Sequence, residues 1–317
     1  MKQIQNELTK KTSKKEALPL ITAIRKNPLR YALLLPALLL TFYFSYVPMV
    51  GALIAFMDYD IFGGIFGSAW VGLDNFKKIF ATPMFAQSIG NTIYLSMLNL
   101  LINQPTPIIF ALLINEIKAT KFKRILQTVS YLPHFLSYIA VIGMAHSVFS
   151  TYGVINDIRV AIIGEGAERI NLLASQALFV PNVIILSVWK SFGWASIVYL
   201  AAITGIDPQL YEAAYVDGAN RFKQCLYITL PSIIPTAIMI FIIQIGCIFQ
   251  DNFDLIYGLQ NAFIDFETIS TIVYKQGITA GDYSMAAALG LFQGVLGFLL
   301  VAVANKFSKK VNDIALW

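Results

Sequence analysis

Six long, nearly uncharged apolar runs divide this sequence, and they constrain its fold more than any other feature. They cover approximately Tyr31–Met57, Gly90–Leu113, Leu126–Phe149, Ala177–Ile203, Ser232–Gln250 and Met285–Asn305. Each run can supply the roughly 20 apolar residues that cross a hydrocarbon core of about 30 Å. Backbone polar groups find no water partners in that layer, so each run should be an α-helix. The sequence therefore predicts an all-α membrane protein with six transmembrane helices.

The composition agrees with this class. Hydrophobic residues make up 57% of the 317 residues, charged residues 13%, and the mean hydropathy is +0.67. The weakly alternating pattern of a membrane β-barrel is absent. A cleaved signal peptide is the alternative interpretation of the first run. That run is too long for a signal peptide and no small-residue cleavage site ends it, so we expect it to remain as a membrane helix.

Basic residues predict the orientation of the helices, because loops rich in Lys and Arg stay on the cytoplasmic side. Seventeen of them fall in the first 30 residues, in the connections after the second and fourth runs, and in the C-terminal tail. The opposite side has five: Lys77, Lys78, Arg159, Arg169 and Lys275. We therefore expect a cytoplasmic segment 1–30, a six-helix domain 31–305 and a cytoplasmic tail 306–317. The sequence pI near 9.0 then reflects topology and not nucleic-acid binding.

No pattern in the sequence predicts catalysis. The chain has no phosphate-binding P-loop and no Gly-Lys pair. His134 and His146 lie in an apolar run without a nearby carboxylate, so we interpret them as packed side chains and not as metal ligands. Cys225 and Cys247 lack the spacing of a zinc site and do not suggest a disulfide. We expect a chain without enzymatic activity, metal or cofactor of its own.

Lys190 is a charge in an unfavourable place, about midway along the fourth run. An ionised lysine at the centre of a membrane helix costs roughly 2.5 to 3.5 kcal/mol on insertion scales. It should therefore face a water-filled cavity, a partner subunit or the interior of the bundle. A shifted helix register that lets Lys190 reach an interface is the alternative. Pro105 and Pro107 should break the second helix, either at a functional bend or at an inert kink.

The three longer connections are expected on the extracytoplasmic side, before Gly90, around 150–176 and from 251 to 284. They could hold short helices or partner surfaces. The first of them, "DYDIFGGIFGSAWVGLDNF", is rich in glycine and aromatic residues, and Trp and Tyr favour the headgroup layer. We expect this connection to be a folded loop close to the membrane interface.

A polar insert at residues 207–231 separates the fourth run from the fifth. Asp207 suits a helix N-cap and Pro208 the first helical position, which predicts a short helix through Val216. Gly218 then forms a turn signal with the aspartate before it, and Asn220 can cap a second helix toward Thr229.

Small residues gather near this bend and would let another backbone approach closely. Four larger side chains could anchor the insert in a groove: Tyr211, Tyr215, Phe222 and Leu226. These patterns predict a helical hairpin at the cytoplasmic membrane surface that docks on a partner. A loop that packs only under its own bundle is the alternative.

The stretch "EAAYVDGANRFKQCLYITLP" resembles the EAA signature of importer-type ABC transporter permeases. The matching residues, with Asp217 beside the glycine, are Glu212, Ala213, Ala214, Asp217, Gly218, Ile228, Leu230 and Pro231. "VWKSFGWASIVYLAAITGIDPQLYEAA", "YLPHFLSYIAV" and "GDYSMAAALG" resemble the carbohydrate-type permeases, particularly the branch for polysaccharides and complex oligosaccharides. The resemblance covers nearly all of residues 27–317. Cys225 departs from it, since many relatives have an aromatic residue there.

The resemblance implies a transporter with a division of labour. An extracytoplasmic solute-binding protein delivers the solute, two homologous permeases in the membrane lipid form the path, and two cytoplasmic ATPase subunits bind ATP and Mg. The hairpin is then expected to dock on an ATPase subunit, with Glu212 in a charged contact and Gly218 at the bend. Lys190 matches a Trp-Lys family pattern, which implies a place in the permease core, in the path or at the subunit interface. The implied location is the cytoplasmic membrane of a bacterium or archaeon, and family habit favours a heterodimeric permease pair.

Two classes of function follow from these observations. The first is an ABC importer permease for an oligosaccharide or polysaccharide fragment, with a peptide or another solute as the alternative substrate. The second is an ion-coupled secondary carrier, in which Lys190 would take part in coupling. No residue in the sequence identifies the solute directly.

Overall fold

The computed structural model describes residue 22, residues 25–164 and residues 166–312, without the side chains of residues 311 and 312. Most of the predicted cytoplasmic segment 1–30 and the last five residues of the tail 306–317 therefore lie outside the described residues. The chain forms two compact units, Met1–Leu53 and Ile54–Trp317.

The described part of the first unit is helical and apolar. Helix α3 (Pro28–Thr41) begins with a proline at its first position and contains Pro36 in its interior. A π-helical turn, η1 (Phe42–Tyr46), and a 3-10 helix, η2 (Val47–Phe56), follow directly. No side chain of α3 is buried, and its leucines are exposed on all sides. A helix that is apolar all round is typical of a membrane span.

Six helical stretches in the described part of the chain are long and apolar enough to cross a membrane. They are Pro28–Phe56, Pro83–Glu116, Tyr138–Ile163, Gln176–Thr204, Arg221–Gly246 and Tyr283–Lys310. The predicted class and number of spans are thus confirmed. The third stretch was predicted twelve residues too early, at Leu126–Phe149. Pro133 lies in a 3-10 turn that interrupts this run, so the long apolar stretch begins only at Tyr138.

Proline also interrupts the second span. A single residue, Gln104, separates helix α6 (Pro83–Asn103) from α7 (Pro105–Glu116), which confirms the break predicted at Pro105. The chain then continues through α8 (Thr120–Tyr131) and the 3-10 turn η3 (Leu132–Phe135). Beyond this turn lie α9 (Tyr138–Phe149) and α10 (Val154–Ile163).

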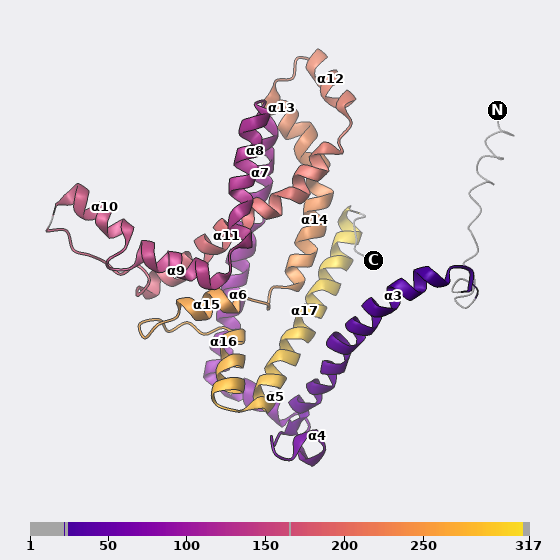
Figure 1. Ribbon diagram of the computed structural model, residues 1–317, viewed down its shortest axis with the longest axis vertical. Helices are drawn as coiled ribbons and strands as arrows, with labels where there is room; N and C mark the ends of the chain where they lie inside the picture. The colour runs from indigo at the N-terminus through magenta and orange to yellow at the C-terminus, as the bar shows by residue number, and fades with distance from the viewer. Residues whose placement is uncertain (1–21, 23–24, 165, 313–317) are drawn as a thin grey trace. The chain divides into compact units, whose positions relative to one another are not determined.

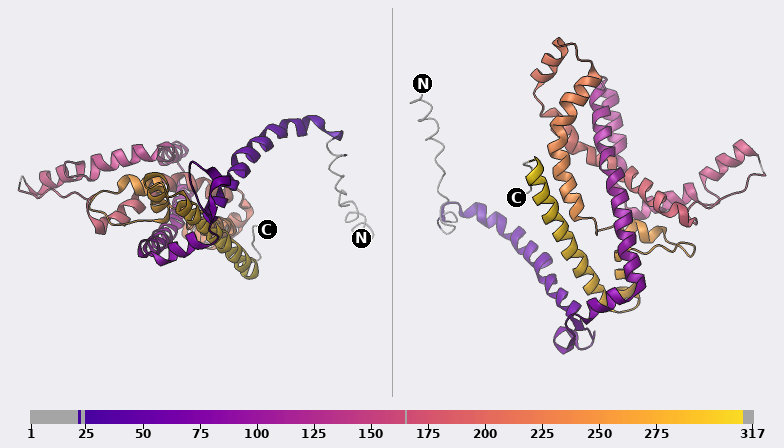
Figure 2. Two further views of the ribbon diagram at one scale, coloured as in Figure 1. Left: turned by 90° about the horizontal axis from the view of Figure 1, so that it is seen from below. Right: turned by 180° about the vertical axis from the view of Figure 1, so that it is seen from behind.

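Helix α11 (Gln176–Thr204) is the central helix of the second unit and packs against α6, α7, α8 and α14. Figures 1 and 2 show it crossing the bundle beside α6 and α7. Its buried side chains, among them Phe179 and Tyr199, contribute to two apolar clusters. A third cluster joins α5, α16 and the start of α17. The densely packed α11 therefore positions the surrounding helices.

The polar insert after α11 forms α12 (Pro208–Val216) and α13 (Arg221–Gln224). A π-helical turn, η4 (Cys225–Thr229), continues without a break into α14 (Leu230–Gly246). Figure 1 shows α12 and α13 together at one end of the second unit. Helix α17 (Tyr283–Asn312) runs beside α14 and packs against it.

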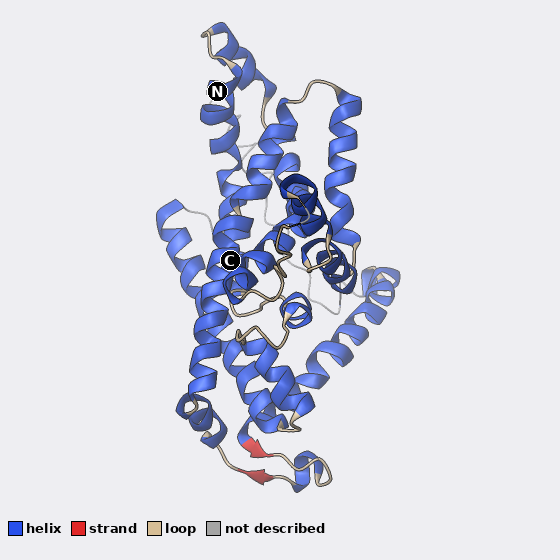
Figure 3. Cartoon of the chain, turned by 90° about the vertical axis from the view of Figure 1, so that its left-hand side faces the viewer, coloured by secondary structure: helices blue, strands red, loops and turns tan. Residues whose placement is uncertain are grey.

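The connections predicted to be extracytoplasmic are folded, as expected. The first pairs β1 (Met57–Asp58) with β2 (Ala69–Trp70) in antiparallel register, with α4 (Gly64–Gly67) between them and α5 (Asp74–Ala81) after them. Figure 3 shows this strand pair, in red, at the end of an otherwise helical molecule. The third connection contains α15 (Phe253–Leu259), α16 (Ile269–Tyr274) and the π turn η5 (Lys275–Thr279).

Candidate functional site

The insert folds as the predicted hairpin. The Asp207 carboxylate accepts a hydrogen bond from the Gln209 amide at 2.9 Å and caps α12, which ends at Val216 as predicted. Gly218 has φ +74°, a left-handed conformation that side chains rarely adopt. The Asn220 side chain accepts from the Lys223 amide at 2.9 Å and caps α13. Local capping and turn chemistry therefore determine the shape of this segment.

The signature residues divide into an exposed group and an anchoring group. Glu212, Ala213, Asp217, Gly218 and Pro231 are exposed, whereas Ala214, Ile228 and Leu230 are half-buried. Leu230 packs against the cluster that contains Tyr199 and Ile233. Four of the exposed residues, Glu212, Ala213, Asp217 and Gly218, form an accessible tip, and the half-buried residues join the hairpin to the bundle. The π turn η4 lies directly before Pro231, which has no N–H to continue an α-helical pattern.

Two side-chain contacts brace the hairpin. The Tyr211 hydroxyl lies 2.9 Å from the Thr229 hydroxyl, so Tyr211 ties α12 to the helix after the bend. The Arg221 guanidinium lies 3.4 Å from the Glu116 carboxylate at the end of α7. Tyr211 is therefore an internal brace and not the free anchor that the sequence predicted. Tyr215 and Phe222 remain largely exposed.

Lys190 lies in the interior of the second unit and is 7% exposed. Its ammonium donates a hydrogen bond of 2.6 Å to the His134 carbonyl and stands 4.8 Å from the centre of the Tyr138 ring. The His134 ring stacks on Trp194 with centroids 4.6 Å apart. His134 belongs to the turn between α8 and α9, where the helical hydrogen-bond pattern is interrupted. Lys190 thus supplies a donor to a carbonyl at a helix break, and His134 is a packed histidine.

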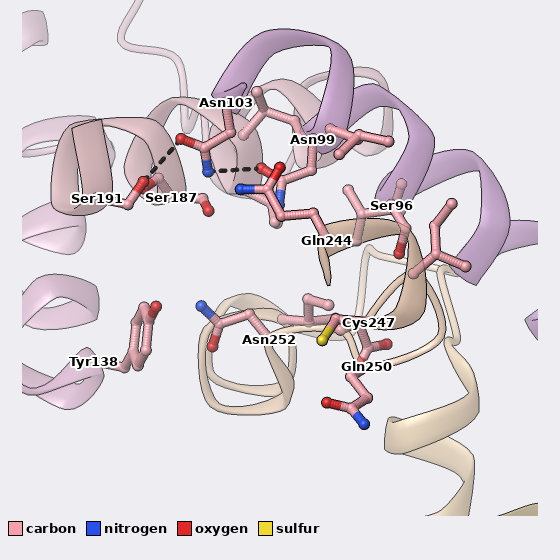
Figure 4. Close-up of a pocket in the computed structure, with 17 residues that line it drawn as sticks. Ser96, Asn99, Asn103, Tyr138, Ser187, Ser191, Gln244, Cys247, Gln250 and Asn252 are labelled. Atoms are coloured by element: carbon pink, nitrogen blue, oxygen red, sulfur yellow. Dashed lines mark hydrogen bonds between the residues drawn. The ribbon is translucent and has the colours of Figure 1, made fainter. Parts of the chain in front are cut away.

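A polar cavity of about 440 Å³ lies between four helices and the loop after α14. Its polar lining residues are Ser96, Asn99 and Asn103 of α6, Tyr138 of α9, Ser187 and Ser191 of α11, Gln244 of α14, and Cys247, Gln250, Asp251 and Asn252 of the loop. In Figure 4 the amides of Asn99, Asn103 and Gln244 lie on one side of the open space, and Tyr138 and Asn252 lie on the other. Side-chain amides and hydroxyls from several helices therefore surround one chamber.

Hydrogen bonds fix part of this lining. The Ser191 hydroxyl donates to Asn103 Oδ1 at 2.8 Å, and the Asn103 side-chain amide donates to Asn99 Oδ1 at 3.3 Å (Figure 4). Two residues that line this cavity, Gln244 and Asp251, each have a buried side-chain oxygen, Oε1 and Oδ2, without a hydrogen-bond partner among the described residues. Buried polar atoms of this kind normally have partners, so these two oxygens are suited to a ligand that carries O–H or N–H donors.

Asp251 is the acidic residue of this lining. The Ser270 hydroxyl donates a short hydrogen bond to Asp251 Oδ1, which ties the loop to the start of α16. Burial raises the pKa of the Asp251 carboxyl above its ordinary value, and hydrogen bonds from Ser270 and Thr268 counteract part of this effect. The Asp251 carboxyl therefore stays neutral to a higher pH than a carboxyl in water.

Metal ligands do not cluster in the described residues, since no group of three or more His, Cys, Asp or Glu side chains could hold an ion there. Cys225 and Cys247 are both free thiols. The geometry of the described residues offers hydrogen bonding and a shaped chamber.

The model of one protein family, "Binding-protein-dependent transport system inner membrane component", matches residues 79–313. This match includes the hairpin and all the residues that line the cavity. The chain belongs to this family. Its members are transport permeases, so the protein is a membrane component of a transport system.

Relatives cover almost the whole permease. The polygalacturonan/rhamnogalacturonan transport system permease protein YteP of Bacillus subtilis is 40% identical over 290 residues, which are 90% of this chain and 89% of that relative. Protein LplB of the same organism is 39% identical over 300 residues, covering 94% and 93% of the two chains. A chain of a bacterial alginate ABC transporter, solved in complex with an alginate pentasaccharide-bound periplasmic protein, is 36% identical with a TM-score of 0.84. That likeness covers 94% of this permease and 99% of the solved chain.

Sequence reasoning located the permease hairpin but missed the cavity. Asn99, Asn103, Gln244 and Asp251 are separated by up to about 150 residues in sequence, and no local motif connects them. One signal was available, because uncharged polar residues inside apolar spans usually face a bundle interior or a water-filled path. The amides at 99, 103 and 244 satisfy this criterion.

Proposed function

We propose that the protein is the path-forming permease of an ATP-driven importer for an oligosaccharide or polysaccharide fragment, and that the solute passes through the polar cavity. The observation that carries this proposal is the pair of buried, unpartnered acceptors, Gln244 Oε1 and Asp251 Oδ2, on a chamber lined by amides and hydroxyls. Sugar hydroxyls would donate to these oxygens and would also accept from the neighbouring amides.

The chemistry of the chamber favours a saccharide over a peptide. Its lining combines many short, uncharged hydrogen-bonding groups with apolar walls, such as Leu95, Val183 and Ile256. A pocket of this composition suits a ligand with hydroxyls around an apolar ring. The names of the similar permeases agree, since they refer to polygalacturonan or rhamnogalacturonan and to alginate.

ATP and Mg are proposed to bind on two partner ATPase subunits, and the hairpin couples their closure to this chain. The tip with Glu212, Ala213, Asp217 and Gly218 is accessible to a partner. The anchoring residues Ile228 and Leu230, with the exposed Pro231 after them, lead into α14, which carries Gln244 of the cavity. A push on the tip is thereby transmitted along one continuous helix toward the solute. Ala214 lies at the start of this route.

A second, homologous permease and membrane lipid are proposed to cover the apolar side chains that the described helices expose. The basic residues of Lys118–Arg124 and of the α17 end support the proposal that the hairpin side faces the cytoplasm. Both termini are therefore assigned to the cytoplasmic side of a bacterial or archaeal inner membrane. A solute-binding protein would then approach from the side of α4 and α16.

Lys190 is proposed to support the translocation path from behind its wall. Its ammonium holds the break between α8 and α9 and contacts the ring of Tyr138, which lines the cavity. This position explains why a membrane helix retains a charge at its centre. An ion-coupling role would require access to the path, so the position of Lys190 behind the wall argues against that role.

Reconstitution in liposomes tests the function. The permease is inserted together with its homologous partner, the ATPase pair and the binding protein, and uptake of a labelled oligogalacturonide or alginate oligosaccharide is measured. We expect uptake that needs both ATP and the binding protein. Uptake driven by an ion gradient without ATP would instead make the protein a secondary carrier. ATP-dependent uptake of peptides in place of saccharides would retain the importer and overturn the substrate class.

A further inference from the structure

The first connection displays two aromatic side chains that have no aromatic partner among the described residues. Phe62 is 95% exposed and Phe66 is 104% exposed, at the tip of the loop between β1 and β2. Ile61 beside them is also exposed. Large apolar side chains in such positions mark interaction surfaces when they cluster and when their backbone is ordered. We call Ile61, Phe62 and Phe66 the tip patch.

The backbone under the tip patch is held by a dense set of hydrogen bonds. The Asp60 carboxylate accepts from the amides of Phe62 and Gly63, both at 3.1 Å. The Ser68 hydroxyl donates to the Gly64 carbonyl at 2.6 Å and accepts from the Asp60 amide at 3.0 Å. The phenylalanines are therefore presented on a preorganised loop, which lowers the entropy lost on binding.

The base of the loop is fixed to the bundle. Asn75 is 3% exposed, and its side-chain amide donates to the carbonyls of Ala55 and Met57 at 3.0 and 2.9 Å. The Trp70 ring stacks on Phe56 with centroids 5.6 Å apart. The Tyr59 amide donates to the Ser284 hydroxyl at the start of α17 at 2.8 Å. The tip patch consequently has a defined position relative to α17.

This position lies outside the hydrocarbon layer. Roughly 20 helical residues cross that layer, and 20 residues counted back from Lys306 of α17 reach about residue 286. Ser284 and the strand pair bound to it therefore stand at the outer edge, with the tip beyond them. Figures 1 and 2 show α4 at the opposite end of the second unit from the hairpin. Tyr59 and Trp70, whose residue types favour the headgroup layer, lie at the base and not at the tip.

The charge around the tip patch is negative. No Lys or Arg occurs between Arg30 and Lys77, whereas the exposed Asp58 and Asp60 directly precede the patch. Lys77, the first basic residue after the patch, is paired with Asp74. Anionic headgroups would be repelled by such a surface, and a protein with a basic rim would be attracted to it. The similar alginate transporter was solved with a solute-loaded periplasmic protein, so a protein partner on this side has a precedent in a related chain.

We propose that the tip patch, with its acidic rim, is an anchor for the extracytoplasmic solute-binding protein, in an apolar pocket rimmed by basic residues on that partner. This inference rests on the proposed importer function and adds the surface that receives the partner. Aromatic side chains on a rigid loop are typical of the few residues that dominate an interface.

The test uses the full transporter in nanodiscs and the purified binding protein that stimulates ATP hydrolysis by the wild-type complex. The binding protein is titrated against wild type and against the double variant Phe62→Ser, Phe66→Ser. The side chains of Phe62 and Phe66 are fully exposed in the described part of the chain, so the variant should assemble normally. We expect the concentration for half-maximal stimulation to rise at least about tenfold, with unchanged basal and maximal hydrolysis. Phe263→Ser, at a 74% exposed phenylalanine of another extracytoplasmic loop, is the matched control and should leave the titration unchanged.

An unchanged titration in the double variant would overturn the proposal and would indicate that the tip patch contacts the membrane surface instead. Loss of the second permease from the purified complex would overturn it in favour of a permease contact. A photo-crosslinking amino acid at position 62 provides a second measurement and should form a covalent adduct with the solute-loaded binding protein. If no binding protein stimulates even the wild-type complex, the importer function itself is wrong. This outcome differs from failure of the tip-patch proposal, because the Phe263→Ser control then shows no stimulation either.

Discussion

The hairpin at residues 207–231 and the polar cavity are built in opposite ways. The caps at Asp207 and Asn220, which shape the bend of the hairpin, join residues two or three positions apart in sequence, although Arg221 also pairs with Glu116 at the end of α7. The cavity instead gathers side chains from α6, α9, α11 and α14. Local chemistry therefore determines the coupling element, and tertiary packing determines the solute site. The two regions share α14, which begins after the hairpin and ends beside the cavity. We expect substitutions in one region to affect coupling and substitutions in the other to affect solute affinity.

The largest effect is expected from Gly218→Trp. A bulky side chain on the exposed bend blocks the approach of a partner subunit, and the φ of +74° adds backbone strain. Uptake in proteoliposomes should fall to background while membrane insertion stays normal. Gly281→Trp is a matched control, because Gly281 has the same φ of +74° and likewise has no atom within 4 Å of an added Cβ. Near-normal uptake by the Gly218 variant would remove the docking role of the hairpin.

Glu212→Lys should produce the next largest loss. Glu212 is exposed on α12 and makes no ion pair within the described residues, so its charge is available to a partner. Reversal of this charge should lower ATP-dependent uptake more than about tenfold, since like charges facing each other in an interface cost several kcal/mol. Glu168→Lys, at an exposed glutamate of an extracytoplasmic connection, serves as the control. Equal uptake in the two variants would show that the charge of Glu212 makes no contact with a partner subunit.

Gln244→Leu tests the role of the polar cavity in solute binding. The leucine removes a buried acceptor that we assign to a sugar hydroxyl, and one such hydrogen bond contributes about 1 kcal/mol or more. The KM for uptake should rise roughly fivefold, while hydrolysis stimulated by the binding protein persists. Gln87→Leu, at an exposed glutamine of α6 away from the cavity, should leave the KM unchanged. A Gln244 variant with wild-type KM would place the solute elsewhere.

Asp251 gives a pH-dependent effect of intermediate size. Burial raises the pKa of its carboxyl, so the neutral form persists to higher pH than in an ordinary aspartate. Uptake by the wild type should decline as pH rises through this raised pKa, because a charge then forms in the cavity. Asp251→Asn keeps the side chain neutral and should remove that decline. A pH profile that is identical for the two proteins would contradict this role of the carboxyl.

Lys190→Met should have the smallest effect, on stability. The methionine fits the same volume but leaves the His134 carbonyl without its donor, which costs about 1 kcal/mol in a membrane protein. A small decrease in the thermal unfolding midpoint of the purified protein is expected, with uptake reduced only in proportion. Lys77→Met, at an exposed lysine, is the control. Complete loss of uptake without loss of stability would instead assign Lys190 to the transport step.

The contrast between the two regions also explains what the sequence could predict. Apolar runs of sufficient length predicted six spans, and capping residues predicted α12 to its last residue, because both signals are local. The third span was misplaced because the effect of Pro133 depends on its neighbours: Lys190 of α11 binds the carbonyl of His134 and stabilises the break. Asn99 and Gln244 were not singled out, because an amide in an apolar run gains its meaning only when another helix places a second amide opposite it.

One measurement compares the two regions directly. The Gly218→Trp and Gln244→Leu complexes are assembled with the same partners, and both oligosaccharide affinity and binding-protein-stimulated ATP hydrolysis are determined for each. The account predicts that the hairpin variant retains solute affinity and loses stimulated hydrolysis, whereas the cavity variant retains stimulated hydrolysis and loses affinity. If both variants lost the same property, coupling and solute binding would not be separate functions of these two regions, and the central claim would be wrong.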